Sequence, residues 1–400
     1  MIAVILAAGE GTRMRPLTRN RPKVMLPIAN KPIVEHLLIE AREAGIKDFI
    51  FIVGYCDAQV RSYFGRGEKW GVNIAYSEQR KQLGTADAIR MVENMVDGKF
   101  LVINGDVVVG RDDIRQLLDN DNNTMSVFEV TDAGGLGIVK TEVDRVVGIY
   151  EKTQHPPTLL ANAGLYLFTS EVFDAISRTE KSPRGEYEVT DTLQILMDSP
   201  RGLNYRQMQS WLDVSYPWDL LAVNEMMLSS LEPANLGEIE DNAVIKGPVA
   251  VGKGSVIKSG SYIIGPVIIG ENCDIGPNCF IRPSTSIGNG CHVGAAVEVK
   301  NSIIMNGSKI PHHNYVGDSV IGEQCNLGAG TKIANLRLDK NNIKVAGIDT
   351  GRRKLGAILG DNVEIGINAS INVGTVIGDN TFIGPGAVAN GIIKPESKVY

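Results

Sequence analysis

The segment LAAGEGTRMRPLTRNRPKVMLP, from Leu6 to Pro27, determines how the first half of this 400-residue chain is interpreted. It follows an apolar run at residues 1–6, which predicts a buried strand. Gly9 and Gly11 end that run, and glycines beyond a strand let backbone N–H groups approach an anion closely. The basic side chains that follow favour a polyphosphate ligand: Arg13, Arg15, Arg19, Arg21 and Lys23. The alternative is a surface turn with solvated arginines.

Two common phosphate motifs are excluded, because G-E-G-T-R lacks the third glycine of the dinucleotide fingerprint and no G-K-[S/T] follows. The segment instead resembles the signature of the sugar-1-phosphate nucleotidylyltransferases, L-A-A-G-x-G-T-R-(x)-x-P-L-T-x-x-x-P-K-x-(x)-x-P, at every signature position. The resemblance implies that Arg13 and Lys23 are catalytic cations on the phosphates. It also implies nucleotide contacts from Leu6, Ala8, Gly9, Gly11 and Thr12.

Length and composition predict a cytoplasmic protein of two domains, since 400 residues exceed what one core usually holds. The net charge of −6 argues against a nucleic-acid or membrane partner. We find no apolar run long enough for a membrane span and no basic region ahead of residues 1–8 as in a signal peptide. The five cysteines lack C-x-x-C spacing, so neither a disulfide nor a zinc site is expected.

Strand and helix patterns alternate in residues 1–231 and predict an α/β, Rossmann-like domain with a mostly parallel sheet. The expected strands are 49–53, 72–76 and 100–104, and the expected helices are 33–44, 86–96 and 216–231. Ligands of such sheets bind beyond the carboxyl ends of the strands. Gly9 and Asp106 are expected at such ends.

Asp106 follows the strand at 100–104 and, from sequence alone, either binds a divalent cation or caps the next helix. The family resemblance adds Asp213, in W-L-D-V-S-Y-P-W at 211–218, as a second metal ligand. Mg²⁺ suits such a site, because it binds through one or two carboxylates together with substrate phosphates.

The resemblance also implies contacts to the base and the sugar. Gln79, Gly84 and Thr85, in Q-R-K-Q-L-G-T, would contact the base, although a plain helix N-terminus explains the same residues. The sugar-phosphate site would contain Gly137, Glu151, Lys152 and Asn162. The reaction would be attack of a sugar 1-phosphate on the α-phosphorus of a nucleoside triphosphate, which needs positioning and charge stabilisation rather than a protein nucleophile.

A period of six residues begins after a break at 232–238 and predicts a parallel β-helix over residues 239–400. Apolar residues recur at every sixth position from Ile239 to Met305, often followed by glycine. Such repeats form a solenoid with three repeats to a coil. The small inward positions include Cys273, Cys279, Cys291 and Cys325, which are therefore expected to be buried.

The period is interrupted between Met305 and Ile321, and again at about residues 335–357. Interruptions of a solenoid map to loops, often on the binding face. The segment 282–335 resembles the acetyltransferase domain of the bifunctional UDP-N-acetylglucosamine pyrophosphorylase/glucosamine-1-phosphate acetyltransferases. It carries R-P at 282–283, V-E-V-K at 297–300, G-S-K-I-P-H-H-N-Y-V-G-D at 307–318 and N-L-G-A-G-T at 326–331.

On that register His312, rather than His313, is the general base, since imidazoles titrate near neutral pH. A structural or solvated histidine is the alternative. The resemblance implies a left-handed coil, acetyl-CoA as co-substrate and a homotrimer or a multiple of it. Its substrate residues would be Arg282, Lys300, Tyr315, Asn326, Asn335 and Lys344, with Ala329 near the thioester. Lys344 is preferred over Lys340 without a motif, because the family's N-Y-D-G is replaced here by N-L-R-L.

Two functional hypotheses follow. The first is a bifunctional enzyme that acetylates glucosamine 1-phosphate, or another amino-sugar 1-phosphate, and transfers a nucleotidyl group from UTP or dTTP to a sugar 1-phosphate. The alternative is a monofunctional glucose-1-phosphate thymidylyltransferase or related pyrophosphorylase, whose solenoid only oligomerises or binds an effector. A non-enzymatic subunit is disfavoured, because the cations and carboxylates of the first domain are all retained.

Overall fold

The computed structural model describes the whole chain except Lys152 and Gln154. Its internal contacts define two compact units. The first consists of Met1–Glu10, Arg21–Met25 and Pro32–Asp213, and the second consists of Gly11–Asn20, Leu26–Lys31 and Val214–Tyr400. The sequence predicted two separately folding domains with the limits 1–231 and 239–400. These domain limits stay a prediction. In the part of the chain that the structure describes, no helix has the length and apolar character to cross a bilayer.

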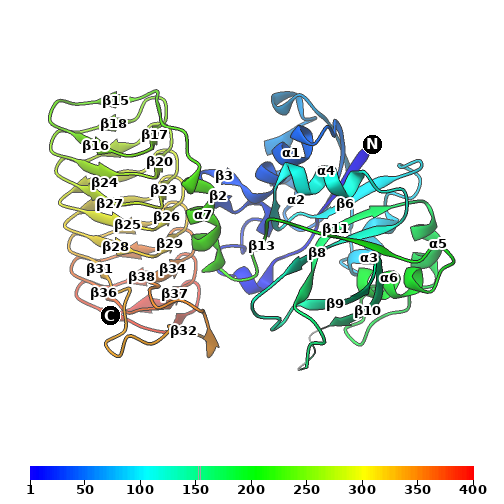
Figure 1. Cartoon of the computed structure of the whole chain (residues 1–400). Coiled ribbons are helices and arrows are strands. Elements are labelled where there is room, and N and C mark those ends of the chain that lie inside the picture. Colours follow the sequence, from blue (N-terminus) through cyan, green and yellow to red (C-terminus); the bar gives the residue numbers. More distant parts are fainter. Residues whose placement is uncertain (152, 154) are drawn as a thin grey trace. The chain divides into compact units, whose positions relative to one another are not determined.

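A nine-stranded sheet forms the centre of the first unit, in the order β5-β4-β1-β6-β11-β8-β12-β10-β9 (Figure 1). Its parallel part contains β5 (Asn73–Glu78), β4 (Asp48–Val53), β1 (Ile2–Ala7) and β6 (Phe100–Asn104). These are the strands that the apolar runs predicted.

The other strands of the sheet pair mainly antiparallel: β11 (Leu160–Phe168), β8 (Thr124–Glu129), β12 (Asn204–Gln207), β10 (Arg145–Glu151) and β9 (Gly137–Glu142). The expected parallel arrangement therefore holds for the part from β5 to β6 and for the pair of β8 and β12. Direct connections such as the β9–β10 hairpin replace crossover helices here, and a hairpin can join only antiparallel strands.

Helices pack on both faces of this sheet because successive strand residues point to opposite sides. One face, which includes Ala3 and Ile5, packs against α1 (Ile33–Glu43), α2 (Asp57–Phe64) and α4 (Arg111–Leu118). The other, which includes Val4, packs against α3 (Thr85–Arg90), α5 (Glu171–Ser177) and α6 (Val189–Met197). α3 is shorter than the helix predicted at 86–96. The 3-10 helices η1 (Thr12–Met14), η2 (Lys23–Met25) and η3 (Glu68–Trp70) lie in connections.

The second unit is a parallel β-helix, consistent with the left-handed form that the resemblance implies. Three parallel sheets run along it (Figure 1). The first contains β14 (Ala234–Asn235), β17 (Val249–Val251), β20 (Val267–Ile269), β23 (Thr285–Ile287), β26 (Ile303–Ile304), β29 (Val320–Ile321), β34 (Ala357–Leu359), β37 (Thr375–Ile377) and β40 (Ile392–Ile393). The second contains β15 (Glu238–Ile239), β18 (Val256–Ile257), β21 (Asp274–Ile275), β24 (His292–Ala295), β27 (Lys309–His312), β30 (Asn326–Leu327), β35 (Glu364–Ile365), β38 (Phe382–Ile383) and β41 (Lys398–Val399). The third contains β16 (Val244–Lys246), β19 (Tyr262–Ile264), β22 (Phe280–Ile281), β25 (Glu298–Lys300), β28 (Tyr315–Gly317), β31 (Lys332–Ile333), β36 (Ser370–Ile371) and β39 (Val388–Ala389).

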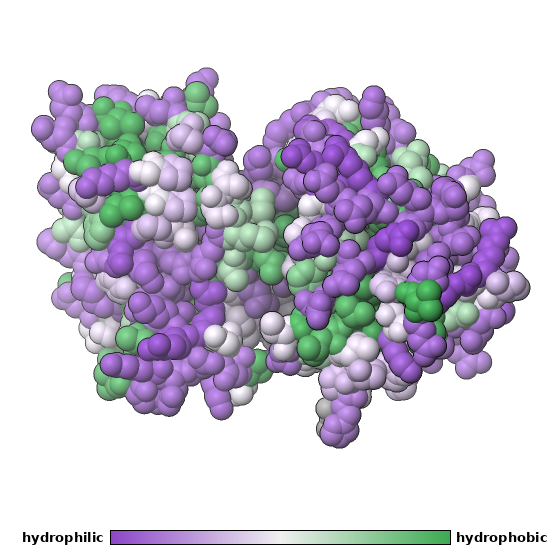
Figure 2. All heavy atoms as spheres, viewed as in Figure 1, coloured by the Kyte–Doolittle hydropathy of each residue, from purple (hydrophilic) through white to green (hydrophobic). Residues whose placement is uncertain are grey.

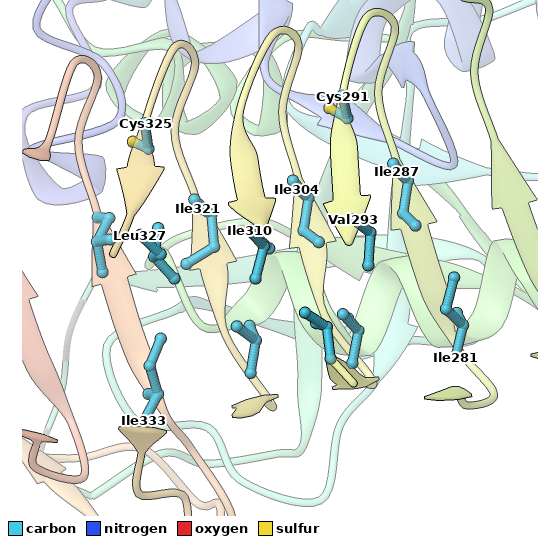
Figure 3. Close-up of a cluster of buried hydrophobic side chains, with 14 of the residues drawn as sticks. Ile281, Ile287, Cys291, Val293, Ile304, Ile310, Ile321, Cys325, Leu327 and Ile333 are labelled. Atoms are coloured by element: carbon cyan, nitrogen blue, oxygen red, sulfur yellow. The ribbon is translucent and has the colours of Figure 1, made fainter. Parts of the chain in front are cut away.

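The core of the β-helix is a set of stacked rows of inward apolar side chains (Figure 3). Ile263 lies beside Ile281 of the next coil, and Ile281 lies beside Val299 of the coil after it. The four repeat cysteines are buried in this core, which confirms the prediction made from their position in the repeat: Cys273, Cys279, Cys291 and Cys325.

The first interruption of the six-residue period is not a loop, and the expectation that it would be one was wrong. The Cys273 amide donates to Ser255 Oγ, 18 residues earlier, whereas the equivalent Cys325 amide donates to Ser308 Oγ, 17 residues earlier. Coils in this region are thus one residue shorter, and the chain continues regularly through β27 and β28. Ile304, rather than Met305, carries on the inward row (Figure 3).

The second interruption does form a loop, residues 335–356, which contains the antiparallel pair of β32 (Lys344–Val345) and β33 (Ile348–Asp349). An isolated bridge between Leu336 and Lys354 closes its base. We call this segment the insertion.

Two segments outside the repeats also belong to the second unit. Helix α7 (Asp219–Ser229), shorter than predicted, packs against β2 (Pro27–Ile28) and β23. The buried Asn224 Oδ1 accepts hydrogen bonds from the Ala29 amide at 2.9 Å and from Ser286 Oγ at 2.6 Å. The second segment is the loop Gly11–Asn20, in which Arg19 Nη2 donates to Glu396 Oε1 at 3.2 Å, across 377 residues of sequence. β2 also pairs with β3 (Lys31–Pro32).

Candidate active sites

Lys23 and Asp106 form an ion pair in the first unit, with Lys23 Nζ 2.5 Å from Asp106 Oδ2. Lys23 begins η2 and is buried, and Asp106 follows β6. Gly105 makes this approach possible, because a Cβ there would lie 2.6 Å from the Leu6 carbonyl oxygen and 2.9 Å from Val24 Cγ1. The Gly105 amide donates to that same Leu6 oxygen at 2.9 Å. The structure therefore brings two of the predicted residues together.

Asp213 lies beside Asp106. It ends β13 (Trp211–Asp213), which pairs antiparallel with β7 (Val107–Val109), so that Asp213 faces Val107, the neighbour of Asp106. Among the described residues, no three or more His, Cys, Asp or Glu side chains gather in a metal-binding group. Two carboxylates fit Mg²⁺ that takes its other ligands from water and from the phosphates of a nucleotide.

The loop that follows β1 has local order of its own. Gly11 adopts a left-handed conformation at φ 62°, and its carbonyl oxygen accepts a hydrogen bond from Thr18 Oγ1 at 2.8 Å. Thr12 then starts η1. The Arg13 guanidinium lies over the Tyr216 ring, 5.6 Å from its centroid. Such a cation–π contact holds the side chain while leaving its charge unneutralised.

A cavity of about 630 Å³ opens at the carboxyl ends of β4 and β5, lined by Glu10, Gly54, Tyr55, Glu78, Gln79, Arg80 and Gln82. Ala8 borders this region, and its carbonyl oxygen accepts hydrogen bonds from the Tyr55 amide and from Gln82 Nε2. A Cβ at Gly9 would meet nothing within 4 Å, so the backbone there is open to a ligand. This is where an α/β sheet binds its ligands.

The residues predicted to contact the base also make hydrogen bonds and packing contacts within the protein. Gln79 is buried, and its Nε2 donates to the Gly84 carbonyl oxygen and to Asp87 Oδ2, both at 3.0 Å. Gly84 is needed for packing, because a Cβ there would lie 2.3 Å from the Tyr187 carbonyl oxygen. Thr85 Oγ1 accepts from the Val189 amide at 2.8 Å. Gly84 and Thr85 therefore also join α3 to the start of α6.

The predicted sugar residues gather on the adjacent strands. Glu151 ends β10 and pairs with Gly137, where a Cβ would meet Glu151 Oε1 at 2.9 Å. Asn162 Nδ2 donates to the buried Tyr166 hydroxyl at 2.9 Å. Burial raises the pKa of Tyr166, the Asn162 hydrogen bond works against this shift, and the negative charges of Glu151 and Asp106 add to it. Lys152 lies outside the described residues.

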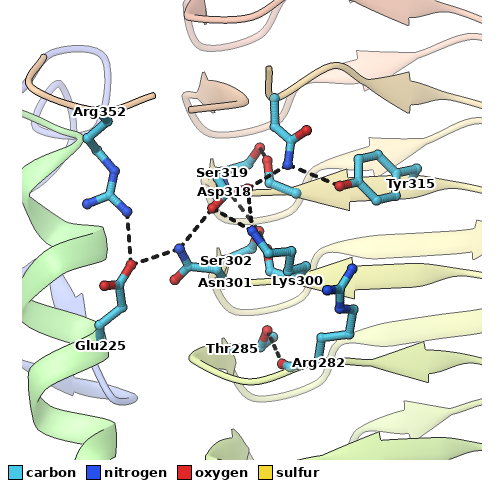
Figure 4. Close-up of polar contacts among 12 residues, drawn as sticks. Glu225, Arg282, Thr285, Lys300, Asn301, Ser302, Tyr315, Asp318, Ser319 and Arg352 are labelled. Atoms are coloured by element: carbon cyan, nitrogen blue, oxygen red, sulfur yellow. Dashed lines mark hydrogen bonds and ion pairs between the residues drawn. The ribbon is translucent and has the colours of Figure 1, made fainter. Parts of the chain in front are cut away.

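In the second unit, Asp318 is the centre of a polar cluster (Figure 4). Its side chain is only 2% exposed. Lys300 Nζ donates to both carboxylate oxygens, at 3.0 and 2.9 Å. Asn335 Nδ2 donates to Asp318 Oδ2 at 2.5 Å and to the Tyr315 hydroxyl at 3.0 Å. The structure thus joins Lys300 and Asn335 through a carboxylate that sequence reasoning did not select, and Asn335 adds Tyr315 to the cluster.

The other predicted phosphate ligand, Arg282, donates to Glu298 Oε1 at 2.9 Å. Arg282 directly follows β22, Lys300 ends β25, and Asn335 lies two residues after β31. These three strands belong to the same sheet. Burial raises the pKa of Tyr315, although the Asn335 amide works against this shift. The phenol therefore stays protonated and can donate a hydrogen bond.

The remaining predicted acetyl-transfer residues come from β27, β30 and the insertion. His312 is exposed at the end of β27, and its carbonyl oxygen accepts from the Gly330 amide at 3.0 Å. Asn326 Nδ2 donates to Glu364 Oε2 at 3.1 Å, and the Ala329 carbonyl oxygen accepts from the Asn368 amide at 2.8 Å. Lys344 is exposed in β32 and lines a pocket in the insertion together with Arg337, Lys340, Asn341, Asn342, Asp349 and Arg353.

Four residues of the Asp318 cluster were missed from the sequence: Asp318, Asn301, Glu225 and Arg352. Asp318 follows Gly317, which pairs with Lys300 in the neighbouring coil, so the repeat itself could have placed Asp318 near Lys300. Glu225 and Arg352 carry no such signal, because they come from α7 and from the insertion.

The fold and the two polar sites define a class of protein, in which an α/β phosphate-binding unit is joined to a hexapeptide-repeat β-helix. Residues 2–230 match the nucleotidyl transferase family, and residues 263–378 match the GMPPB C-terminal domain. A bifunctional protein GlmU from Methanocaldococcus jannaschii is 40% identical over 100% of this chain and 97% of its own length. A bifunctional sugar-1-phosphate nucleotidylyltransferase/acetyltransferase from Sulfurisphaera tokodaii is 40% identical over 98% of this chain and 97% of its own length.

Among solved structures, a candidate glucose-1-phosphate thymidylyltransferase from Bacillus anthracis superposes with a TM-score of 0.53 at 27% identity, covering 59% of this chain and 98% of its own. The chain belongs to the nucleotidyl transferase family and, over its full length, to the bifunctional nucleotidylyltransferase/acetyltransferase enzymes. The sequence-based recognition of this family and of its fold is confirmed.

Proposed function

We propose that the enzyme makes a nucleotide sugar in two steps. The second unit would transfer an acetyl group from acetyl-CoA to the amine of glucosamine 1-phosphate or another amino-sugar 1-phosphate. The nucleotidyl transferase region, residues 2–230, would transfer a nucleotidyl group from UTP or dTTP to a sugar 1-phosphate. The observation that carries the proposal is that each unit holds its own cluster of paired charges, Lys23 with Asp106 and Lys300 with Asp318.

In the nucleotidyl transfer, a phosphate oxygen of the sugar 1-phosphate attacks the α-phosphorus of the triphosphate. The new P–O bond forms as the bond to the departing pyrophosphate breaks. Lys23 and Arg13 would neutralise the phosphate charge, and the backbone of Leu6, Ala8, Gly9, Gly11 and Thr12 would hold the nucleotide. Glu151, Asn162, Gly137 and Lys152 would bind the sugar, and Gln79, Gly84 and Thr85 the base. Asp106 and Asp213 would hold Mg²⁺, which polarises the phosphate when it is bound.

In the acetyl transfer, the sugar amine attacks the thioester carbonyl carbon. The C–N bond forms, the C–S bond breaks and CoA leaves as the thiolate, while His312 accepts the proton from the amine. Arg282 and Lys300 would hold the sugar phosphate, and Tyr315, Asn326 and Asn335 the sugar and the acetyl group. Ala329 would lie near the thioester, and Lys344 would add a cation from the insertion.

The test uses the full-length enzyme and two product assays. Pyrophosphate release from four nucleoside triphosphates, each with several sugar 1-phosphates, identifies the nucleotide and the sugar. Thiol release from acetyl-CoA with glucosamine 1-phosphate tests the second activity, with a blank that lacks the sugar because Cys56 is a half-exposed thiol of the protein. Pyrophosphate release without any thiol release would favour the monofunctional alternative.

We also propose that the chain assembles as a homotrimer or a multiple of it. The β-helix exposes large apolar side chains, among them Phe382, Val388 and Ile392. Figure 2 shows green, hydrophobic patches on the surface of the molecule. Apolar patches of this kind often mark subunit interfaces. Sedimentation equilibrium should give the mass of three chains or a multiple, and a monomer at all concentrations would contradict this. The cytoplasmic location stays a prediction.

A further inference from the structure

Glu225 reaches the Asp318 cluster from outside the β-helix coils (Figure 4). It lies on α7, and its Oε1 accepts a hydrogen bond from Asn301 Nδ2 at 2.8 Å. The same oxygen accepts from Arg352 Nη2 of the insertion at 2.9 Å. One carboxylate oxygen therefore joins a helix, a coil and the insertion.

Asn301 links Glu225 to Asp318. Its Nδ2 donates to Asp318 Oδ1 at 2.9 Å as well as to Glu225. An amide nitrogen has two hydrogens, so both donors are used and the amide is held from two sides. The bonded series runs from Arg352 through Glu225 and Asn301 to Asp318, which holds Lys300 and Asn335.

Each carboxylate of this series is paired with a cation, and the neutral Asn301 amide lies between the two pairs. The Arg352 and Lys300 cations lie beside the Glu225 and Asp318 carboxylates, and the Arg352 and Lys300 side chains are each only 20% exposed. Removing one member leaves its neighbours in a poorly solvated place without a partner, so they must move. Lys300, Asn335 and, through Asn335, Tyr315 lie at the far end of the series and would move with them.

We propose that Glu225 and Arg352 are positioning residues of the acetyl-transfer site, an inference that rests on the proposed function. They touch no substrate in this scheme. They fix the Asn301 amide, and thereby the Asp318 carboxylate, in the position that presents Lys300 to the sugar phosphate and Tyr315 to the sugar and the acetyl group. α7 and the insertion are then parts of the site, which the β-helix coils alone do not complete.

Glu225→Gln in the full chain tests this, because it keeps the shape of the side chain and removes its charge. The KM for glucosamine 1-phosphate in thiol release should rise about ten-fold, as expected when a hydrogen bond to a charged group is lost. The value of kcat should change far less, because His312 lies outside the bonded series and the lost interaction acts on substrate binding. Pyrophosphate release should be unchanged, which also shows that the variant is folded.

Asp274→Asn is the matched control. Asp274 is a half-exposed carboxylate of the same β-helix, 2.5 Å from Lys258 Nζ, and its loss should leave the KM unchanged. Arg352→Gln should raise the KM like Glu225→Gln, and the double variant should be no worse than either single one, because both act through one contact.

An unchanged KM in Glu225→Gln, an equal rise in Asp274→Asn, or additive effects in the double variant would each overturn the inference. Absence of thiol release from the wild-type enzyme is a different result. It would overturn the proposed acetyl transfer and, with it, this inference.

Discussion

Replacing Lys23 by methionine should change metal binding and turnover in opposite directions. The Lys23 ammonium lies 2.5 Å from Asp106 Oδ2, and Asp106 is one of the two carboxylates proposed to hold Mg²⁺. A divalent cation must displace the ammonium before it can use that oxygen. Methionine keeps the flexible apolar stem and removes the charge, so the competing cation is lost.

The size of each effect follows from the burial of the pair. The Asp106 side chain is 32% exposed, so the ion pair is partly screened and is worth about 1 kcal/mol. Its removal should tighten divalent metal binding about five-fold. The same substitution removes a cation from the phosphates in the transition state. By analogy with other preorganised donors, turnover should fall by about 10²–10³-fold.

Metal affinity can be measured without nucleotide, by following free Mn²⁺ with electron paramagnetic resonance. Turnover is measured as pyrophosphate release from UTP and N-acetylglucosamine 1-phosphate. Lys99→Met is the control, because Lys99 Nζ pairs with Asp121 Oδ1 at 2.8 Å in the same unit, away from the site. If Lys23→Met binds Mn²⁺ no more tightly than the wild type, the ammonium does not compete with the metal. If its turnover stays within a few-fold of the wild type, Lys23 has no catalytic role.

Three further changes have defined outcomes. His312→Ala should lower thiol release by about 10²–10⁴-fold, whereas His313→Ala should keep it within a few-fold; equal losses would refute the choice of base. Asp318→Asn should destabilise the β-helix by about 3–5 kcal/mol, because it breaks a buried ion pair, and calorimetry with an unchanged unfolding midpoint would contradict this. Iodoacetamide at mildly alkaline pH should label Cys56 alone in the native protein, because the four repeat cysteines are buried and the reagent cannot reach them; mass spectrometry showing a repeat cysteine labelled would be the opposite result. Burial also raises the pKa of Cys279 and Cys325, whereas the hydrogen bond with Cys291 lowers the pKa of Cys273, so Cys273 is the strictest test of this protection.

The sequence could predict the inward rows of the β-helix up to Val299, because the coils there keep one length and the six-residue period follows directly. It could not predict the shift at Ile304. Ile303, Ile304 and Met305 are consecutive buried apolar residues, so the loss of one residue from the coil leaves no mark in the pattern. The hydrogen bonds between coils decide which of them faces inward.

Residues of the candidate sites could be predicted where they belong to a recognised motif, but their contacts could not. The signature predicted Lys23, and the position after a strand predicted Asp106. Their contact depends on how closely Gly105 approaches Leu6 and Val24. Asp318 stood inside a quoted motif, and its importance came only from what the adjacent coils place beside it. Glu225 could not be predicted from the sequence, because the position of α7 depends on hydrogen bonds of Asn224 to residues far away in the sequence.

The contact of Arg19 with Glu396 has a consequence for the order in which the protein is made. Arg19 belongs to the loop Gly11–Asn20, and Glu396 follows it by 377 residues. Domains generally fold from the N-terminus during synthesis. Here the loop around Arg19 acquires this partner only after a further 377 residues have been synthesised, so a chain truncated before Glu396 would lack the contact.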